Sequence, residues 1–371
     1  MGRRRATAKS VRSDALAPRA PSAEEKPRVL AWLDAGLRRG EGTLAAEYPL
    51  ALGPDAAAEQ RVVFDGGAPA AHALLVRAEV LARGRALRVG LIGSVYSDPA
   101  RRGRGHAQAC VRACLEAARA QGLALALLWS DLPDFYAKLG FVPAGRDVLL
   151  DVDAALLARA GAPAACDVGL PRPEEWAVLE ALHAKKPVHV HRPAGALARF
   201  AAAPGTALAV ARRGGRPVAY AALGRGDDFA GVVHEWAGDA DGVLACLARF
   251  VAACGPVRLL AGPEPEPPLP RLVGAGARVE RRPLGLVHLL DARELWSAIA
   301  PRPLPVRFAS RGERVELSAG GATLLLPAAA ALELCFGAGP SVLGEAVDDF
   351  ARSALAAALP WPLYVWGFDS V

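Results

Sequence analysis

The stretch LRVGLIGSVYSDPARRGRGHAQ, residues 87–108, holds the elements that decide the fold. It begins with an apolar run at 87–96 that is typical of a strand. The turn after Pro99 is rich in glycine and arginine, and from His106 to Gln121 apolar residues recur at helical spacing. The next run, LALALLWS at 123–130, is typical of a strand buried on both faces. This order predicts an α/β domain.

The turn between the strand and the helix has the chemistry of an anion site. The first backbone N–H groups of a helix lack partners within it, and the helix dipole favours a negative charge there. Glycine lets the backbone approach a diphosphate closely, and arginine adds charge-assisted hydrogen bonds. The segment RGRGHAQ at 102–108 combines these residue types at the start of the helix. The sequence therefore predicts a diphosphate-binding turn.

Three motifs in this order resemble the GCN5-related N-acetyltransferase (GNAT) superfamily. The acetyl-CoA loop of that superfamily has the form R/Q-x-x-G-x-G/A, which Arg102, Gly105 and Ala107 match. A Val-x-x-x-Pro step precedes the loop at Val95–Pro99, and an aromatic-Tyr-x-x-x-Gly-Phe element follows it at Phe135–Phe141. A Rossmann-type nucleotide site is the alternative, but the third glycine and the ribose-binding acid of that motif are missing.

The resemblance implies an acetyl-CoA-dependent enzyme. The backbones of Val95 and Ser97 would bind the pantetheine arm where two strands part, and the amides of residues 103–108 would hold the diphosphate. Tyr136 would be the general acid that protonates the departing thiolate, a role that suits its reference pKa of about 10. The alternative for Tyr136 is a core aromatic with a bonded hydroxyl. The implied cofactor-binding residues are Val95, Ser97, Arg102, Gly103, Arg104, Gly105, His106, Ala107 and Gln108.

The general base is not evident near this motif. Many members of the superfamily use a glutamate on the strand before the loop, and residues 86–96 contain no acid. The remaining side-chain candidates are Glu47, Glu79, Asp131 and Asp134. We interpret each of them as a solvated surface charge, so none is chosen as the base.

A weaker second copy of the pattern follows a proline-containing linker. It comprises a helix at 176–183, a hairpin at 207–223, a strand at 232–236, a helix at 243–254 and a strand at 257–261. Where its diphosphate turn should lie, the sequence AGDADGVLA carries Asp239 and Asp241. Acids there would repel a diphosphate, so we predict that this copy does not bind CoA.

The tandem resembles the Eis-like acetyltransferases (enhanced intracellular survival), whose third unit is similar to sterol carrier proteins. The expected fold class is α/β (α+β): tandem GNAT folds with mixed, mostly antiparallel sheets flanked by helices, plus a small sterol-carrier-like C-terminal domain. The expected divisions are a disordered basic leader at 1–26, a catalytic GNAT domain at 27–152, a degenerate GNAT-like domain at 165–292 and the sterol-carrier-like domain at 293–371.

In the Eis-like pattern the chain's own C-terminal carboxylate enters the active site of the first domain and acts as the base. The resemblance therefore implies that Val371 is catalytic. The tail WPLYVWGFDSV at 361–371 suits that role, because its aromatic residues would anchor it in a groove. The alternative is a tail that packs only as the end of its domain.

Composition limits the class of protein. The chain has 371 residues, of which 53% are hydrophobic and 22% charged, and no apolar run is long enough to span a membrane. Residues 1–28 carry most of the net charge of +6, and the nearly neutral remainder argues against a nucleic-acid-binding protein. The six cysteines form no CxxC pair, and the scattered histidines show no third metal ligand. We expect a soluble, cytoplasmic protein with no metal and no membrane partner.

Two interpretations of function remain. The first is an acetyl-CoA-dependent N-acetyltransferase that acts by direct attack of a primary amine on a small molecule or peptide. The second is a non-catalytic protein that binds acyl-CoA or an apolar ligand on a vestigial acetyltransferase fold. The intact turn and Tyr136 favour the first. The sequence does not identify the acceptor, because acceptor pockets are formed by loops. Homo-oligomerisation is also possible.

Overall fold

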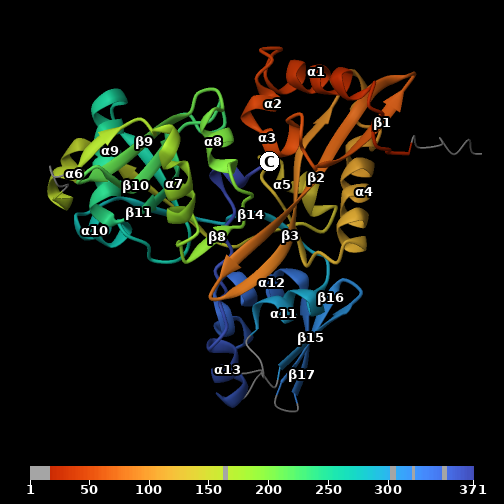
Figure 1. The fold of residues 1–371 in the computed structure, drawn as a ribbon. Coiled ribbons are helices and arrows are strands. Elements are labelled where there is room, and N and C mark those ends of the chain that lie inside the picture. Colours follow the sequence, from red (N-terminus) through yellow and green to blue (C-terminus); the bar gives the residue numbers. More distant parts are fainter. Residues whose placement is uncertain (1–16, 162–165, 301–305, 320–321, 345–348) are drawn as a thin grey trace, which may run out of the picture.

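The computed structural model describes residues 17–161, 166–300, 306–319, 322–344 and 349–371. These residues form two units that each carry a seven-stranded sheet and a third with a three-stranded sheet (Figure 1). The C-terminus lies between the two larger units. The expected class, with mixed, mostly antiparallel sheets flanked by helices, is confirmed. No described helix has the length and apolar character needed to cross a membrane.

The sequence predicts strands at 61–65 and 71–80 joined by a turn at Gly66–Gly67, and the first sheet is built on this hairpin. Its strands are β1 (Glu59–Asp65), β2 (Ala68–Ala82), β3 (Arg85–Ser97), β4 (Leu125–Leu128), β5 (Val142–Ala144), β8 (Val188–Val190) and β14 (Gly285–Leu289). The order is β1-β2-β3-β4-β14-β5, with β8 beside β2, and only β3 and β4 pair in parallel among the described strands of this sheet. Gly66 and Gly67 join β1 to β2 with φ of 60° and 80°, the turn that matches strand twist.

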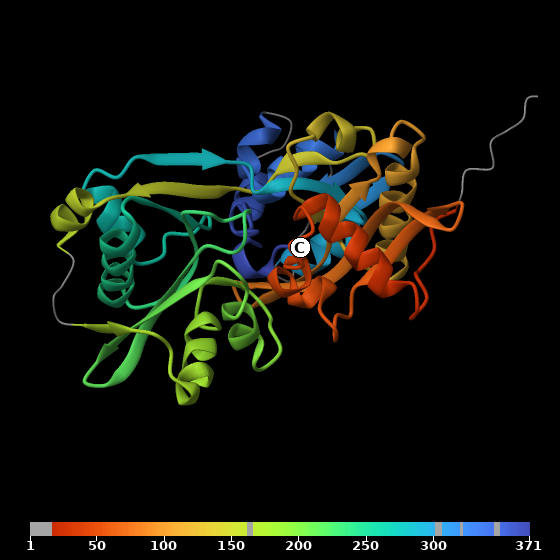
Figure 2. The ribbon, with the colours of Figure 1, turned by 90° about the horizontal axis from the view of Figure 1, so that it is seen from above.

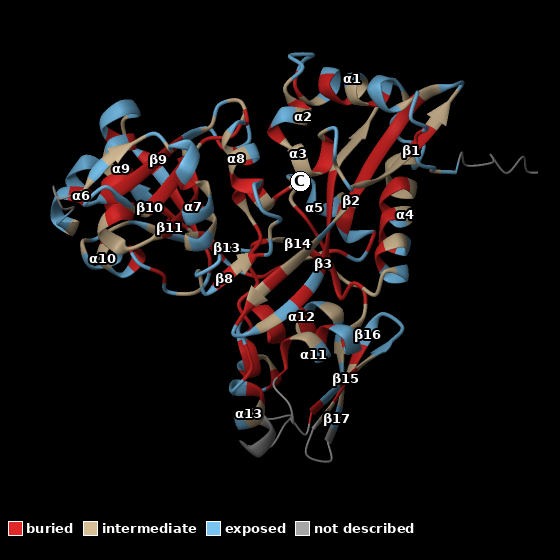
Figure 3. Cartoon of the chain, in the orientation of Figure 1, coloured by how far each residue is buried: buried red, intermediate tan, exposed pale blue. Residues whose placement is uncertain are grey.

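Helices cover both faces of the first sheet. They are α1 (Lys26–Leu37), α2 (Leu44–Glu47), α3 (Pro49–Leu52), α4 (His106–Ala120) and α5 (Pro133–Ala137), with a 3-10 turn η1 (Pro99–Arg101). The stripe predicted for α4 is buried against the sheet, whereas its outer face is exposed (Figure 3). The helices α1, α2 and α3 pack on the opposite face in a separate cluster around Val29, Leu33 and Leu74. The sheet is thereby fixed between two apolar layers.

The second unit repeats this plan. Its strands are β6 (Asp147–Val152), β7 (Asp167–Gly169), β9 (Ala207–Arg213), β10 (Arg216–Leu223), β11 (Val232–Gly238), β12 (Val257–Ala261) and β13 (Val279–Arg282). Its helices are α6 (Ala154–Ala160), α7 (Trp176–His183), α8 (Ala196–Ala201), α9 (Ala240–Cys254) and α10 (Leu269–Gly274), with the 3-10 turn η2 (Pro173–Glu175). The strand order is β13-β6-β12-β11-β10-β9-β7, and it repeats the plan of the first sheet. The helices and strands predicted for the second copy are confirmed.

The two larger units exchange one strand each. β6 pairs with β12 and β13 in the second sheet, and β14 pairs with β4 and β5 in the first. Figure 2 shows β6 and β13 side by side where they reach into the second unit. The sequence predicts a strand at 148–152, which is confirmed, but its expected place as the last strand of the first domain is wrong. Apolar patterning specifies a buried strand, but two equivalent positions exist and pattern alone does not choose between them.

The third unit packs beneath the first sheet. It contains α11 (Ala292–Ile299), β15 (Val306–Arg311), β16 (Arg314–Ala319), β17 (Ala322–Pro327), α12 (Ala328–Phe336), η3 (Gly339–Leu343), α13 (Asp349–Ala356) and, in the tail, η4 (Gly367–Asp369). The sequence predicts strands at 306–308, 315–317 and 323–326, and all three are confirmed. It also predicts a helix from Glu345 to about Leu359, which is described over Asp349–Ala356, and residues 345–348 lie outside the described part of the chain. Leu87 and Leu91 of β3 share a core cluster with Trp296 and Phe308, so this unit is anchored to the first sheet.

Residues 17–25 of the expected leader lie against the edge of the first sheet. Arg19 and Val62 of β1 exchange two backbone hydrogen bonds of 3.0 and 2.8 Å, and the Arg19 guanidinium donates to Glu25 at 2.7 Å. The expected disorder therefore does not extend to residue 26, because the edge of β1 offers backbone partners. Residues 1–16 lie outside the described part.

Candidate active site

The strands β3 and β4 pair and then part. Their parallel register ends where Leu91 lies beside Leu127. β3 continues to Ser97, and Ser94 has φ of 44°, which bends the strand beyond the last pair. Val95 and Ser97, the residues expected to bind a pantetheine arm, lie on the part of β3 that no longer pairs with β4. The structure therefore has a gap between two strands at the place where the resemblance puts the thioester.

The turn between β3 and α4 presents a row of free backbone donors. Gly103 and Gly105 have φ of 78° and 79°, and Gly105 is the N-cap of α4 without any side-chain cap. The backbone N–H groups of residues 102–108 have no hydrogen-bond partner in the described part of the chain. The structure thus brings all the residues predicted for the diphosphate turn together at one helix start.

Arginines surround this turn, and Asp65 and Asp98 partly fix two of them. Asp65 of β1 accepts from Arg104 at 3.1 Å and from Arg101 at 3.3 Å. Arg102 is exposed and has no partner among the described residues. The donor set of uncapped N–H groups, a free guanidinium and a net positive charge fits a diphosphate.

The equivalent turn of the second unit is closed. Asp239 is the N-cap of α9, and its carboxylate accepts from the backbone of Gly242 at 2.7 Å and from Arg213 at 2.9 Å. The side chain of Trp236 donates to the Leu260 carbonyl at 2.9 Å, bridging from β11 to β12. The Asp239 carboxylate already binds the Gly242 N–H at this helix start and would repel a diphosphate there. This supports the prediction that the second copy does not bind CoA.

Tyr136 lies on α5 close to the gap. Its side chain is 6% exposed, and its ring meets Phe135 and Phe141 edge-on at centroid distances of 4.8 and 5.9 Å. Desolvation raises the pKa of Tyr136, and a hydrogen bond from Ser130, just after β4, partly offsets that rise. The phenol is therefore protonated at neutral pH and available as a proton donor.

The C-terminal tail is held by aromatic contacts to both larger units. Trp366 stacks on Trp129, beyond the end of β4, with centroids 4.7 Å apart. Phe368 stacks on Phe200 of α8 at 5.2 Å and meets the edge of His234 at 4.7 Å. The tail thus runs between the first and second units, and its aromatic residues fix it there as expected.

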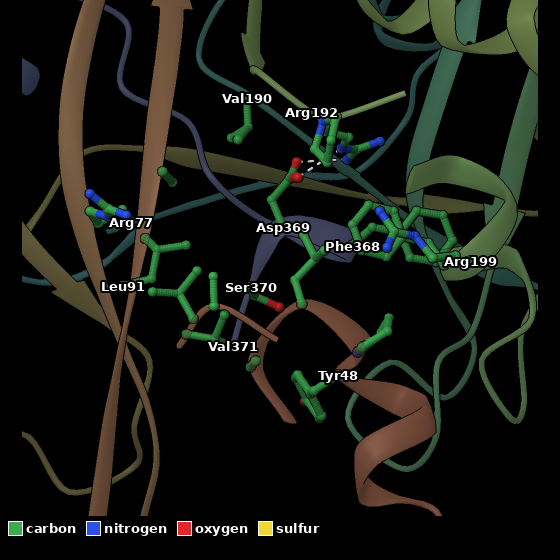
Figure 4. Close-up of a pocket in the computed structure, with 18 of the residues that line it drawn as sticks. Tyr48, Arg77, Leu91, Val190, Arg192, Arg199, Phe368, Asp369, Ser370 and Val371 are labelled. Carbon is green, nitrogen blue, oxygen red and sulfur yellow. Dashed lines mark hydrogen bonds and ion pairs between the residues drawn. The ribbon is translucent and has the colours of Figure 1, made fainter. Parts of the chain in front are cut away.

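An ion cluster fixes the tail one turn from its end. Arg192 donates to Asp369 at 2.7 and 2.6 Å (Figure 4). It also donates to Glu235 at 2.9 and 3.0 Å. Burial alone would raise the pKa of Glu235, but Arg192 and His183 hold that pKa well below its usual range. Ser370 accepts from Arg225 at 2.7 Å. The last residues therefore have little freedom.

The chain ends against β3. A Cβ added to Gly93 would lie 2.5 Å from the terminal carboxyl carbon of Val371 and 2.6 Å from a carboxyl oxygen. Gly93 follows the last pair of β3 with β4 by two residues, so the carboxylate lies at the gap. The sequence analysis did not single out Gly93. A glycine inside a strand is nevertheless a signal of close backbone approach.

Two cavities meet at the tail. One, of about 350 Å³, is lined by Ser94, Trp129, Ser130 and Val371 and so includes the gap. The other, of about 320 Å³, lies on the far side of Tyr48, Ser370 and Val371, which line both cavities. Val371 therefore borders both cavities.

The four acidic side chains that are candidates for the base lie in different environments. Glu47 is 2% exposed and accepts from Arg38 at 2.7 Å and from Thr43 at 2.6 Å, so its interpretation as a solvated charge is wrong. Arg38 also donates to Asp228 of the second unit at 2.6 Å, a long-range pair that no local pattern predicts. The structure thus gives Glu47 a fixed partner.

The other three acids are more accessible. Asp131 and Asp134 are exposed, and Glu79 is half-buried. Among these, Asp131 lines the cavity at the gap. No group of three or more described His, Cys, Asp or Glu residues is arranged to hold a metal ion.

Known proteins share this fold. Residues 23–144 match a family model described as an acetyltransferase (GNAT) domain. Similar solved structures include GCN5-related N-acetyltransferases from Kribbella flavida (18% identity, 91% of this chain and 95% of that chain, TM-score 0.63) and Anabaena variabilis (13%, 91% and 96%, 0.64). Eis1 from Mycobacterium abscessus is similar over 92% of this chain and 96% of that chain (16% identity, TM-score 0.59). No curated protein matches the sequence.

The fold and the turn at its first helix thus define a protein built on tandem acetyltransferase folds. Residues 23–144 match a GNAT domain, and the fold of most of the chain is similar to that of GCN5-related N-acetyltransferases and of Eis1. The match over residues 23–144 indicates an acetyltransferase.

Proposed function

We propose that this chain transfers the acetyl group of acetyl-CoA to a primary amine of a small molecule or peptide by direct attack. The observation that most supports this is the terminal carboxylate of Val371, which lies against Gly93 where β3 and β4 part. A tail that served only to close its own unit would not need to run between the other two. In this proposal the first unit carries the chemistry, and the second unit holds the tail in place.

The proposed acetyl-CoA site is the turn after β3 together with the part of β3 that no longer pairs with β4. Acetyl-CoA supplies the acetyl thioester. The N–H groups of residues 102–108 donate to its diphosphate, and Arg102 adds a charge-assisted bond. The backbones of Val95 and Ser97 bind the pantetheine arm at the gap. The absence of any side-chain cap on Gly105 supports this assignment, because the donors are not already used.

Two groups of the chain move protons in this proposal. An amine is mostly protonated at neutral pH and must lose a proton before it attacks. The Val371 carboxylate accepts that proton. As the C–N bond forms and the C–S bond breaks, Tyr136 gives its phenolic proton to the sulfur. The nitrogen then releases its second proton to solvent, from which the Tyr136 phenolate is protonated again. Because desolvation raises the pKa of Tyr136, the phenol carries this proton at the start of each turnover.

The Tyr136→Phe variant tests the acid role. We expect kcat to fall by about 100-fold or more, the usual scale for general acid catalysis, while the Kd for acetyl-CoA stays the same. The phenyl ring keeps the packing against Phe135 and Phe141, so folding should be preserved. Released thiol measured against amine concentration gives kcat.

Tyr364→Phe is the matched control for this variant. It also removes a phenol from a buried tyrosine, but Tyr364 packs over Gly262 in a different core cluster, whereas Tyr136 lies beside Ser130 after β4. Its kcat should equal that of the native chain. An unchanged kcat in Tyr136→Phe would show that Tyr136 is a core aromatic residue and not the general acid. No turnover of any amine by the native chain, with acetyl-CoA still bound, would favour the non-catalytic binding protein.

A further inference from the structure

The cavity of about 320 Å³ beside the tail is a cleft between the first and second units (Figure 4). Strands β2 and β3 form one wall and α8 with the segment before it forms the other. Most of its lining is apolar, including Leu50, Val76, Leu91, Val190, Phe200 and Phe368. Its size and lining suit a small organic molecule.

Two arginines on opposite walls of this cleft lack partners. Arg77 projects from β2 and Arg199 from α8, on either side of Val371 (Figure 4). Both are exposed, and neither makes an ion pair or hydrogen bond with the described residues. Arg192 also lines the cleft, but Asp369 and Glu235 already bind it. Asp55 is the unpaired acid of the lining and offsets one of the two free charges.

The cleft lies on the acceptor side of the carboxylate. None of residues 102–108 lines it, so it is separate from the proposed diphosphate turn. It nevertheless shares Val371 with the cavity at the gap. A molecule in the cleft can therefore reach the terminal carboxylate with one end while the rest of it lies among the apolar side chains.

We propose that the acceptor is an amphipathic zwitterion: a small amine that carries a carboxylate or another oxyanion on an apolar segment. The Val371 carboxylate receives the amine, the apolar lining packs against the segment, and Arg77 and Arg199 bind the anion. This rests on the proposed function for the role of Val371.

The test compares ω-aminoalkanoates of increasing length with alkylamines of the same length. The aminoalkanoates should show a higher kcat/KM at the best length, by about 10-fold, the scale of one charge-assisted hydrogen bond. The double variant Arg77→Gln/Arg199→Gln should remove this preference and leave alkylamine turnover unchanged. Aminoalkyl sulfonates and phosphates distinguish the type of oxyanion.

The matched control is Arg216→Gln/Arg293→Gln, which removes two exposed arginines without described side-chain partners from outside the cleft. It should retain the preference. Equal kcat/KM for both series, preference for polyamines, or an equal loss for both series in the cleft variant would overturn the proposal while leaving acetyl transfer intact.

Binding separates this proposal from the proposed function. Calorimetric titration of the same compounds needs no turnover, and aminoalkanoates should bind more tightly than alkylamines only while Arg77 and Arg199 are present. Arginine-dependent binding without acetylation of any amine would contradict the proposed transfer but keep the cleft as an anion-binding site. Equal binding of the two series would overturn the site itself.

Discussion

A Gly-Ser extension after Val371 is expected to lower kcat by about 100-fold or more, the scale of a lost general base. The extension converts the terminal carboxylate into a neutral amide. It also adds atoms beside Gly93, where even a Cβ built on that glycine would lie 2.5 Å from the Val371 carboxyl carbon. The fold should survive, because Trp366 and Phe368 still anchor the tail. Acetyl-CoA binding should also survive, because residues 102–108 are unchanged. Thiol release measures the loss.

Three further proteins identify the cause of that loss. A chain whose terminal carboxylate is replaced by a primary carboxamide loses only the basic group, and it should be as slow as the extended chain. Gly93→Val displaces the carboxylate from within β3 and should also be slow. The same Gly-Ser extension placed before Met1 should have no effect. If the extended or carboxamide chain is as fast as the native one, the proton goes instead to water or to Asp131 in the cavity.

Gly105→Glu is expected to weaken acetyl-CoA binding by about 100-fold or more. The new carboxylate would lie at the uncapped start of α4 and repel the diphosphate, much as Asp239 closes the start of α9. A Cβ at Gly105 meets no atom within 4 Å, so the loss would not come from a clash. Calorimetry should find one site per native chain and none detectable in the variant.

Gly195→Glu is the matched control for the strain of this change. Gly195 is the N-cap of α8 with φ of 77° and ψ of 4°, against 79° and 4° at Gly105, and a Cβ there also meets nothing within 4 Å. Both variants therefore carry the same left-handed backbone cost. Only Gly105→Glu should lose acetyl-CoA. Two binding sites per chain, or full affinity in Gly105→Glu, would contradict the assignment of the turn.

The parts of the site that follow from local sequence could be predicted. The strand, the glycine-arginine turn and α4 lie within one short stretch, and helix capping and glycine conformation are local properties. The stripe on α4 and the turn Gly66–Gly67 were predictable for the same reason. The sequence thus predicts which residues form the diphosphate turn.

The long-range parts were not predictable from patterns. β6 and β14 join the sheet of the other unit, and an apolar strand carries no information about which of two equivalent positions it takes. The pair of Arg38 with Asp228 and the burial of Glu47 depend on how the first and second units meet. The path of the tail was expected from resemblance alone. Its aromatic residues and Gly93 are consistent with that path but do not specify it.

The most direct test of the central claim is turnover by the untagged native chain. The chain should be incubated with acetyl-CoA and a panel of amines, aminoalkanoates, aminoglycosides, polyamines and peptides, with released thiol and the acetylated amine measured together. The account predicts at least one amine for which thiol and N-acetyl product appear in equal amounts. Acetyl-CoA that binds to the turn while no amine in the panel is acetylated would contradict it.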